Sequence, residues 1–426
     1  MLGSRSQGHL FSSRLKITLT DHEDKVLRNL VVVVLDGTSA RSVNATGLSA
    51  AELAVTRHLL VHGPATRADL GDRLQLSYAS MSRLARSLLG GGIVAEDLEA
   101  EPGVGRPRQI LSAVPGARHV VGCKLTGDTA FGVVCDMFGE IRASAQVALP
   151  PPGADGAVPA AAAVKAVAQV ASRLGRRVPW LDGIGVSIGG IVANRSLVRE
   201  GTFLGWRDVD FGALLRKRTG LPVVVTNDVT ALAREELWFG AGRTHSTFGL
   251  ITIGAGVGFG VVREGVVVEE LIDNGHLLAH APVDSRGPRC GIGHTGCVAA
   301  YLNRADIERH ASAAAPRPIT FGDLVQARSA GDPTATELLD GAARALGHLA
   351  ATFAGALQTT RIVLAGEDVE AVAASPVMND VVADRLRPGP DEAQRCALDI
   401  STAPLTFNDW ARGAAVVGIQ NILGAL

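Results

Sequence analysis

A run of hydroxyl and guanidinium side chains follows Ser77 in the sequence: Tyr78, Ser80, Ser82, Arg83 and Arg86. Arginine can donate two hydrogen bonds to one guanine edge, and short hydroxyl side chains can bond phosphate oxygens. A helix that enters the major groove of double-stranded DNA needs these groups on its first turns. The run therefore predicts a DNA-contact surface that starts at Ser77, with Arg67 of the preceding helix beside it.

Two short helices joined by a tight turn are predicted to carry these side chains. Thr66 should cap the first helix, which ends near Leu74, because its hydroxyl can accept a hydrogen bond from the first turn. Ser77 should cap the second helix, which stops at the glycines 90–92. The buried side of the second helix is expected to hold Met81, Leu84 and Leu88.

A helix before this pair and a hairpin after it complete the pattern of a winged helix. Residues 48–63 predict the additional helix, and strands are expected at 93–95 and 109–111. The hairpin tip ends in Gly105-Arg-Pro-Arg108, which its proline keeps extended. Two arginines of this tip suit a narrow minor groove: Arg106 and Arg108. The alternative interpretation is an ordinary helical hairpin with a solvated polar face.

The composition limits what kind of protein this can be. The 426 residues exceed one hydrophobic core and predict two or three domains. A formal net charge of -1 and a pI near 6.8 argue against a uniformly basic nucleic-acid coat. Residues 57–118 hold eight arginines and six carboxylates, a local balance of +2. The DNA-binding surface should therefore be small and focused.

Cysteine usage and hydropathy predict a cytoplasmic protein. Five cysteines, two of them in one short loop, suit a reducing compartment better than a disulfide framework. No apolar run approaches the roughly 20 residues that a membrane-spanning helix needs, so no membrane contact is expected. Residues 1–47 show no plausible signal-peptide order and are expected to form a poorly defined extension.

From Val120 onward, buried strands alternate with helices, which is typical of α/β proteins. A strand at 181–192 ends in glycines, and the next buried strand ends in Asn227-Asp228. In α/β sheets, ligands bind at the carboxyl ends of the strands. Residues 248–262 predict a further hairpin with a glycine-rich turn. Units of strand, helix and glycine-turn hairpin thus recur along the chain, which predicts a two-lobed domain with a cleft. The alternative role of Asn227-Asp228 is to cap the following helix.

The ordered motifs resemble those of the ROK family, whose name stands for repressor, open reading frame and kinase. The resemblance covers residues 48–426 and rests on the winged-helix pattern, Gly105-Arg-Pro-Arg108, Leu204-Gly-Trp-Arg-Asp-Val209, Asn227-Asp228, Trp238-Phe-Gly-Ala-Gly242, Gly254-Ala-Gly-Val-Gly258 and Pro282-Val-Asp284. It implies an α/β chain with a winged helix-turn-helix DNA-binding domain at 48–115. A two-lobed actin-like, hexokinase-like (ASKHA) effector domain would follow at 116–426. Family members are sugar kinases without the winged helix or sugar-responsive regulators with it.

The resemblance also implies roles for the cleft residues. Kinases of the family open this domain with Asp-Leu-Gly-Gly-Thr, whose aspartate helps to hold the metal, whereas this chain has Lys124-Leu-Thr-Gly-Asp128. A lysine there reverses the charge that faces Mg²⁺, an effect of about several kcal/mol at a few ångströms. Asp228 matches the family's general base, and Asn227 matches a residue that bonds a sugar hydroxyl. With Lys124 in place, we expect no ATP and no catalytic residue.

The family's sugar pocket is altered as well. Its Glu-x-Gly-His run appears as Leu277-Leu-Ala-His280, and the glutamate two places after the last loop cysteine is Ala299. Each missing carboxylate removes about 1.5–3 kcal/mol of charge-assisted hydrogen bonding, so an ordinary hexose should bind weakly. His280 remains a candidate ligand-binding residue together with Asn227 and Asp228.

A metal site is also implied, with one ligand changed. Related proteins hold a structural zinc with the histidine that matches His280 and three cysteines. Cys290 and Cys297 are present, but Ile292 stands at the middle cysteine position. Tetrahedral zinc needs a fourth ligand, which His294 in the same loop could supply. The alternative is a pair of free thiols.

We therefore expect a transcriptional regulator, in the simplest case a repressor, that binds a palindromic operator as a homodimer or a dimer of dimers. Its kinase-like domain is expected to be inert as an enzyme and to sense a sugar or sugar derivative. One alternative is a ROK-type regulator with no small-molecule ligand, which the missing carboxylates favour. Another is an active sugar kinase with an appended DNA-binding domain, which ATP-dependent phosphorylation of a sugar would reveal.

Overall fold

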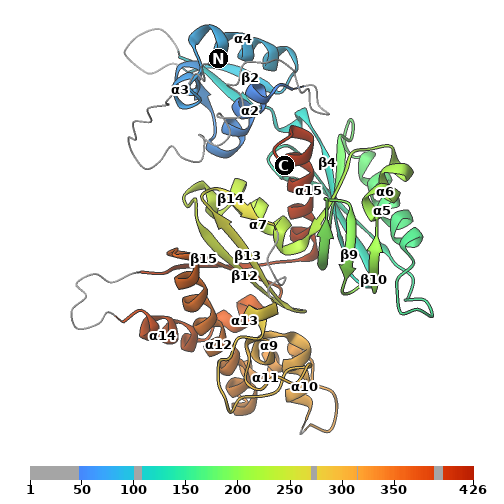
Figure 1. The fold of residues 1–426 in the computed structure, drawn as a ribbon, viewed down its shortest axis with the longest axis vertical. Helices are drawn as coiled ribbons and strands as arrows, with labels where there is room; N and C mark the ends of the chain where they lie inside the picture. The colour runs from blue at the N-terminus through green and yellow to red at the C-terminus, as the bar shows by residue number, and fades with distance from the viewer. Residues whose placement is uncertain (1–47, 100–107, 270–275, 314, 388–396) are drawn as a thin grey trace, which may run out of the picture. The chain divides into compact units, whose positions relative to one another are not determined.

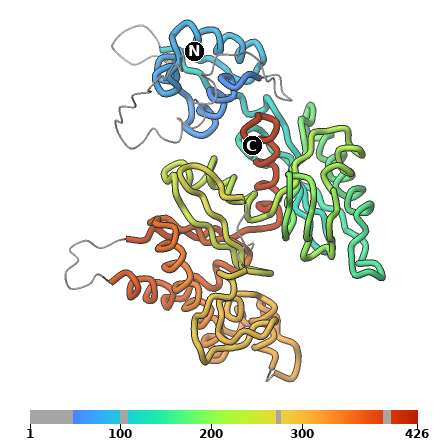
Figure 2. Tube along the Cα trace, viewed as in Figure 1, coloured from blue at the N-terminus to red at the C-terminus, as the bar shows by residue number. Residues whose placement is uncertain are grey.

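The computed structural model of the chain describes residues 48–99, 108–269, 276–313, 315–387 and 397–426 (Figures 1 and 2). Helices and strands alternate through most of this length, and the described strands form two three-stranded and two five-stranded sheets. None of the described helices is long and apolar enough to span a membrane.

Three capped helices and a small antiparallel sheet form the first part of the described chain. The helices are α2 (Ala50–His62), α3 (Arg67–Arg73) and α4 (Tyr78–Gly90). As expected from the sequence, each begins after a hydroxyl side chain that accepts a hydrogen bond from a backbone N–H of the first turn: Ser49, Thr66 and Ser77. The strands are β1 (Ala65–Thr66), β2 (Val94–Glu99) and β3 (Arg108–Ala113), with β3 in the centre.

The core of this first part follows one stripe of α4. Met81 and Leu88 are fully buried there, as predicted. Leu84 is only half-buried, contrary to the prediction, and Ala85 is fully buried instead. Positions four and seven residues after Met81 continue its stripe of the helix, whereas the third position falls at the edge of that stripe.

One histidine is enclosed in this part without a polar partner. His58 on α2 is 3% exposed, and its Nδ1 has no hydrogen-bond partner among the described residues. Burial, together with the positive charges of His62 and Arg73, lowers the pKa of His58 to about 4. The imidazole is therefore neutral in the folded chain near pH 7.

The first five-stranded sheet has the order β11-β7-β4-β5-β6. Its strands β4, β7 and β11 run parallel, and β5 and β6 are antiparallel to their neighbours. The strands are β4 (Val120–Leu125), β5 (Thr129–Cys135), β6 (Ile141–Ala148), β7 (Gly183–Ile188) and β11 (Val223–Asn227). The helices α5 (Ala160–Gly175) and α6 (Phe211–Thr219) share one buried core with this sheet.

The other face of this sheet is covered by α15 (Phe407–Leu423), the last helix of the chain (Figure 1). Two strand glycines let this helix come unusually close. A Cβ on Gly122 of β4 would lie 1.9 Å from the carbonyl oxygen of Ala411, and one on Gly185 of β7 would lie 1.8 Å from that of Ala414. Any larger residue at either glycine would push the helix off the sheet.

A sharp turn divides the single strand predicted at 181–192. The observed strands are β7 and β8 (Gly190–Ala193), which joins β9 (Leu197–Gly201) and β10 (Trp206–Val209) in a separate antiparallel sheet. Gly190 has φ 136°, and a Cβ there would lie 2.0 Å from the carbonyl oxygen of Glu200. Only glycine fits this conformation without strain, so the chain changes direction at this point.

The second five-stranded sheet has the order β14-β13-β12-β15-β16. Its strands are β12 (Phe248–Ile253), β13 (Val257–Arg263), β14 (Val266–Val268), β15 (Arg361–Gly366) and β16 (Asp399–Pro404). α7 (Asp228–Phe239) approaches this sheet at the glycines of β13, where Gly258 and Gly260 face Val229 and Ala233.

The long helix α12 (Pro333–Leu357) belongs to the buried core of this second sheet. The remaining described helices are η2 (Pro115–Ala117), η3 (Ala241–Arg243), α8 (His276–Ala279), α9 (Val298–Leu302), α10 (Arg304–Ser312), α11 (Phe321–Ser329), α13 (Val369–Ala373) and α14 (Pro376–Arg385).

Candidate ligand-binding cleft and metal cluster

The strand register places the key polar residues at one edge of the first sheet. Lys124 of β4 and Thr226 of β11 both pair with Ser187 of β7, which lies between them. All three strands are parallel, so their carboxyl ends reach the same edge. Lys124 and the Asn227-Asp228 pair therefore lie together, as expected for a ligand site of an α/β sheet.

Asn227 fixes the start of α7, as the alternative interpretation of the sequence expected. Its Oδ1 accepts hydrogen bonds from the N–H groups of Val229 at 2.8 Å and Thr230 at 3.2 Å. Its Nδ2 donates to the carbonyl oxygen of Gly190 at 2.9 Å. Asn227 also lines the cleft. The capping role and the binding role are therefore compatible in this residue.

Lys124 forms an ion pair with Asp228 inside the cleft. The lysine is 6% exposed, and the side chain of the aspartate keeps 15% of its exposure. The Lys124 ammonium also lies 5.4 Å from the centre of the Trp410 ring, within the range of a cation–π contact. Asp228 Oδ1 accepts a second bond, from the N–H of Val229. The aspartate thus faces an ammonium group of its own chain.

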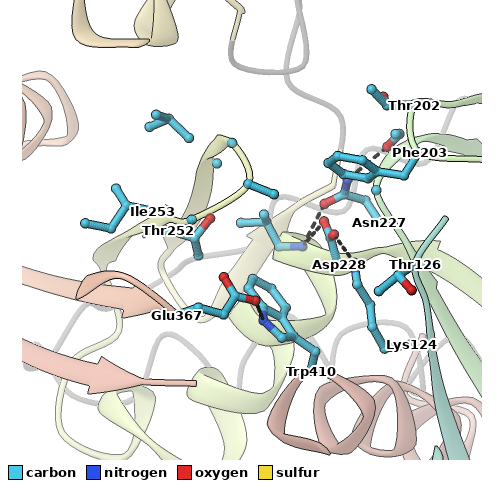
Figure 3. A pocket seen from close by; sticks show the side chains of 18 of the residues that line it. Lys124, Thr126, Thr202, Phe203, Asn227, Asp228, Thr252, Ile253, Glu367 and Trp410 are labelled. Carbon is cyan, nitrogen blue, oxygen red and sulfur yellow. Dashed lines mark hydrogen bonds and ion pairs between the residues drawn. The ribbon is translucent and has the colours of Figure 1, made fainter. Parts of the chain in front are cut away.

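These residues line a cavity of about 350 Å³. Figure 3 shows Lys124, Asn227, Asp228 and Trp410 around it. The cavity is bounded by the ends of β4, β7 and β11, by the glycine turn between β12 and β13, and by the start of α15. Its lining residues are Lys124, Leu125, Thr126, Gly127, Gly189, Gly190, Thr202, Phe203, Asn227, Asp228, Val229, Thr252, Ile253, Gly254, Ala255, Gly256, Val257, Gly258, Phe259, Arg304, Glu367, Phe407 and Trp410.

The other charged side chains of the cleft are also paired. Arg304 donates two hydrogen bonds to Asp368, at 2.8 Å and 2.7 Å. These bonds and the adjacent carboxylates raise the pKa of the Arg304 guanidinium, which therefore stays charged. The indole N–H of Trp410 donates to Glu367 Oε1 at 2.8 Å. The cleft thus combines two ion pairs and one hydrogen-bonded carboxylate with a wall that is largely apolar and glycine-rich.

His280 does not line this cleft, although the sequence analysis grouped it with Asn227 and Asp228. It lies instead in a cluster with Cys290, His294 and Cys297, whose potential ligand atoms are all within 4.8 Å of one another. His280 Nδ1 is 3.8 Å from Cys290 Sγ and 3.5 Å from Cys297 Sγ. Burial lowers the pKa of His280, and His276 and His294 lower it further, so its imidazole is neutral near pH 7.

This cluster fits the requirements of tetrahedral zinc. Zinc–sulfur bonds of about 2.3 Å and zinc–nitrogen bonds of about 2.0–2.1 Å place tetrahedral sulfur and nitrogen ligands about 3.5 Å apart. The two observed sulfur–nitrogen distances are close to that value. Ile292, at the position of the family's middle cysteine, is exposed, and His294 takes the fourth corner of the cluster.

The ROK family matches residues 120–420, which is well over half of the chain. The chain belongs to the ROK family. The match includes every residue of the cleft and of the histidine–cysteine cluster.

Individual relatives include both regulators and kinases. The DNA-binding transcriptional repressor Mlc of Escherichia coli strain K12 is 24% identical over 369 residues, which cover 83% of this chain and 89% of Mlc. A glucokinase of Thermotoga maritima is 38% identical over 136 residues, which cover 32% of this chain and 42% of the glucokinase. The solved structure of a ROK family transcriptional regulator, a homologue of E. coli Mlc, matches with a TM-score of 0.70 at 21% identity. The match covers 87% of this chain and 96% of the chain of that regulator. This likeness establishes the ROK fold.

The described side chains predicted to contact DNA lie at the start of α3, along the first three turns of α4 and at the start of β3. Tyr78 is 81% exposed, Ser77, Arg83 and Arg86 are exposed, and Ser80 and Ser82 are half-buried. Arg108 opens β3 and is exposed, whereas Arg106 lies outside the described residues. Arg67 forms an ion pair of 2.6 Å with Glu96 of β2, so its guanidinium is held against the small sheet.

Sequence reasoning did not find the partner of Lys124 or the aromatic part of this ROK cleft. A buried lysine requires a counter-charge, and Asp228 follows the end of a nearby parallel strand, so the pair could have been inferred from the strand pattern. Phe203, Phe407 and Trp410 gave no comparable signal. They come from a loop and from the first turn of α15, whose position only the folded chain shows.

Proposed function

We propose that this ROK protein is a DNA-binding transcriptional repressor whose kinase-like domain senses a small molecule and performs no catalysis. Residues 48–115 would form the winged helix-turn-helix domain, and residues 116–426 the ASKHA-type effector domain. The observation that carries the DNA-binding role is α4, where Ser77 caps the helix and Arg83 and Arg86 are exposed in its second and third turns. Neither arginine forms an ion pair with a described residue, so both are available to DNA.

The inert effector domain is supported by Lys124. Phosphoryl transfer needs a metal ion to spread charge and a base that can accept the proton of the attacking hydroxyl. Lys124 brings a positive charge to the end of β4 and neutralises Asp228, the residue in the position of the base. The Mlc relative, named as a DNA-binding transcriptional repressor, aligns over most of its length and supports the same interpretation.

A structural zinc is part of this proposal. His280, Cys290, His294 and Cys297 would hold the ion and tie α8 to the loop that leads into α9. Structural zinc contributes to folding by cross-linking a segment that has little regular structure of its own. Two further features extend the proposal: a palindromic operator and a homodimer or dimer of dimers, which is how helix-turn-helix proteins read two half-sites.

The test is selection of DNA by the purified full-length chain from a random-sequence pool, followed by affinity measurements at fixed salt. We expect one sequence to be enriched and Arg83→Ala and Arg86→Ala each to weaken its binding by about 5- to 150-fold, since a contact to a base contributes about 1–3 kcal/mol. Arg177→Ala, at an exposed position outside the DNA-binding segment, is the matched control and should bind like the unmodified chain. If no sequence is enriched, or both α4 variants bind normally, the proposal is wrong.

A further inference from the structure

The charged side chains of the cleft can offer a sugar only the part of their hydrogen-bonding capacity that their partners within the chain leave free. Four of them line the cavity among the described residues, and each is already paired within the chain: Lys124 with Asp228, Arg304 with Asp368, and Glu367 with Trp410. A hydroxyl group of a ligand would have to displace one of these contacts. The new hydrogen bond would recover only part of the free energy of the contact that it replaces. A ligand that presents only hydroxyl groups is therefore a poor match for this cavity.

The cleft instead presents exposed aromatic rings to a ligand. Phe203 is 48% exposed and Phe407 is 38% exposed, and both line the cavity. Phe407 stacks on Phe131 with ring centres 4.5 Å apart and planes inclined by 19°. A large apolar side chain that stays exposed inside a concave site is a binding surface for an apolar group.

Phe203 is held in place by close packing with two glycines. A Cβ on Gly189 would lie 2.8 Å from the Phe203 ring, and one on Gly127 would lie 2.8 Å from the Phe203 carbonyl oxygen. The neighbouring Thr202 N–H donates to the carbonyl oxygen of Gly189 at 3.1 Å. The ring is therefore fixed beside Asn227 and Asp228 before any ligand arrives (Figure 3). Fixed aromatic surfaces bind flat rings at a low entropic cost.

We infer that the ligand of this cleft is an aryl glycoside, a sugar that carries a planar aromatic group. The aromatic group packs on Phe203 and Phe407. The sugar hydroxyls reach Asn227 and Asp228, which lie at the same edge of the cavity. This inference rests on the proposed role of the cleft as the effector site, and it specifies the chemical class of the effector.

The experiment measures binding of matched pairs of compounds to the full-length protein by calorimetry. Each pair is the phenyl and the methyl glycoside of one sugar in one anomeric form, taken through glucose, galactose, xylose and N-acetylglucosamine. In at least one pair, the phenyl glycoside should bind at least about tenfold more tightly, since burying an aromatic ring against aromatic neighbours readily supplies the required 1.4 kcal/mol. Phe203→Ala should remove most of this preference, because it should weaken binding of the phenyl glycoside more than binding of the methyl glycoside.

The control variant is Leu214→Ala, which truncates a side chain of similar exposure on α6, outside the cavity. It should keep the phenyl preference. Equal binding of both members of every pair, or a preference that survives in Phe203→Ala, would overturn the inference. Absence of binding by every compound would overturn it too and would favour a regulator without a small-molecule ligand. The DNA selection described above is independent of these results, so a failed ligand class and a failed DNA-binding role can be told apart.

Discussion

Lys124 and Asp228 should be energetically coupled. The effect of replacing one of them on the free energy of unfolding should depend strongly on whether the other is present. Two unit charges about 3 Å apart attract each other by about 5 kcal/mol at an effective dielectric constant of about 20. Desolvation of both groups offsets much of this attraction, so the pair adds little net stability relative to an apolar pair. Removing one partner is different, because the other charge then stays enclosed without compensation.

The destabilisation expected from removing one partner follows from the burial of Lys124 and Asp228. Loss of one member of a fully buried pair costs about 3–5 kcal/mol. Asp228 keeps 15% side-chain exposure and a hydrogen bond from Val229, which reduce the penalty of Lys124→Met to about 2–4 kcal/mol. The double variant Lys124→Met/Asp228→Asn leaves no unpaired charge. Its destabilisation should therefore fall short of the sum of the single effects by at least about 2 kcal/mol.

Urea denaturation followed by tryptophan fluorescence measures this coupling. All four tryptophans lie after residue 115, so the signal reports mainly on residues 116–426, although Trp238 also contacts Arg57 of α2; Trp410 is next to the Lys124 ammonium. Lys165→Met, the same substitution at an exposed position of α5, should change the free energy of unfolding by no more than about 0.5 kcal/mol. Single effects that add up within about 0.5 kcal/mol would refute the reasoning, since Lys124 would then not compensate Asp228.

Two further predictions concern the histidines. Purified protein should contain zinc by elemental analysis, and His294→Ala should lower that content while His245→Ala, outside the cluster, should not; a metal-free chain or an unaffected His294→Ala variant would contradict the proposed site. The second concerns acid sensitivity. The folded-state pKa of His58, about 4, lies below its unfolded value of 6.5, so stability is retained above pH 6.5 and lost as the pH falls towards 4. Between pH 7 and pH 5 this single group should remove about 2 kcal/mol, a loss that His58→Gln should not show. The free energy of unfolding of both proteins is measured at several pH values from hydrogen exchange of the α2 amides in denaturant. An equal pH dependence in the two proteins would show that His58 does not cause the loss.

The local features of the fold could be predicted because they depend on a few neighbouring residues. Ser49, Thr66 and Ser77 cap the predicted helices because a hydroxyl before a helix has a defined hydrogen-bonding partner in the next turn. Buried strands such as β4 and β12 were visible as apolar runs. The break at Gly190 and the exposed strand β6 were missed, because a single glycine and a half-exposed strand carry weak signals.

The candidate site was only partly predictable, and the reason is its assembly from distant segments. Asn227-Asp228 could be recognised because ligands bind where parallel strands end. His280 was grouped with them by resemblance alone, yet it lies with Cys290 and Cys297, and their approach depends on the fold of the loop between α8 and α9. Phe407 and Trp410 enter the cleft from the last helix, and no pattern in the sequence relates them to β4 or to β11.

The close contact of α15 with β4 and β7 also determines the order in which the chain can fold during synthesis. The segments α2, α3 and α4 make most of their contacts with one another and with β2 and β3, although α2 also contacts α7, so most of this part can fold before the later sheets are complete. The sheet that carries Lys124 is completed only by a helix that comes much later in the chain, because the faces of Gly122 and Gly185 stay uncovered until α15 packs on them. A nascent chain would therefore form the surface proposed to bind DNA before the cleft that is proposed to control it.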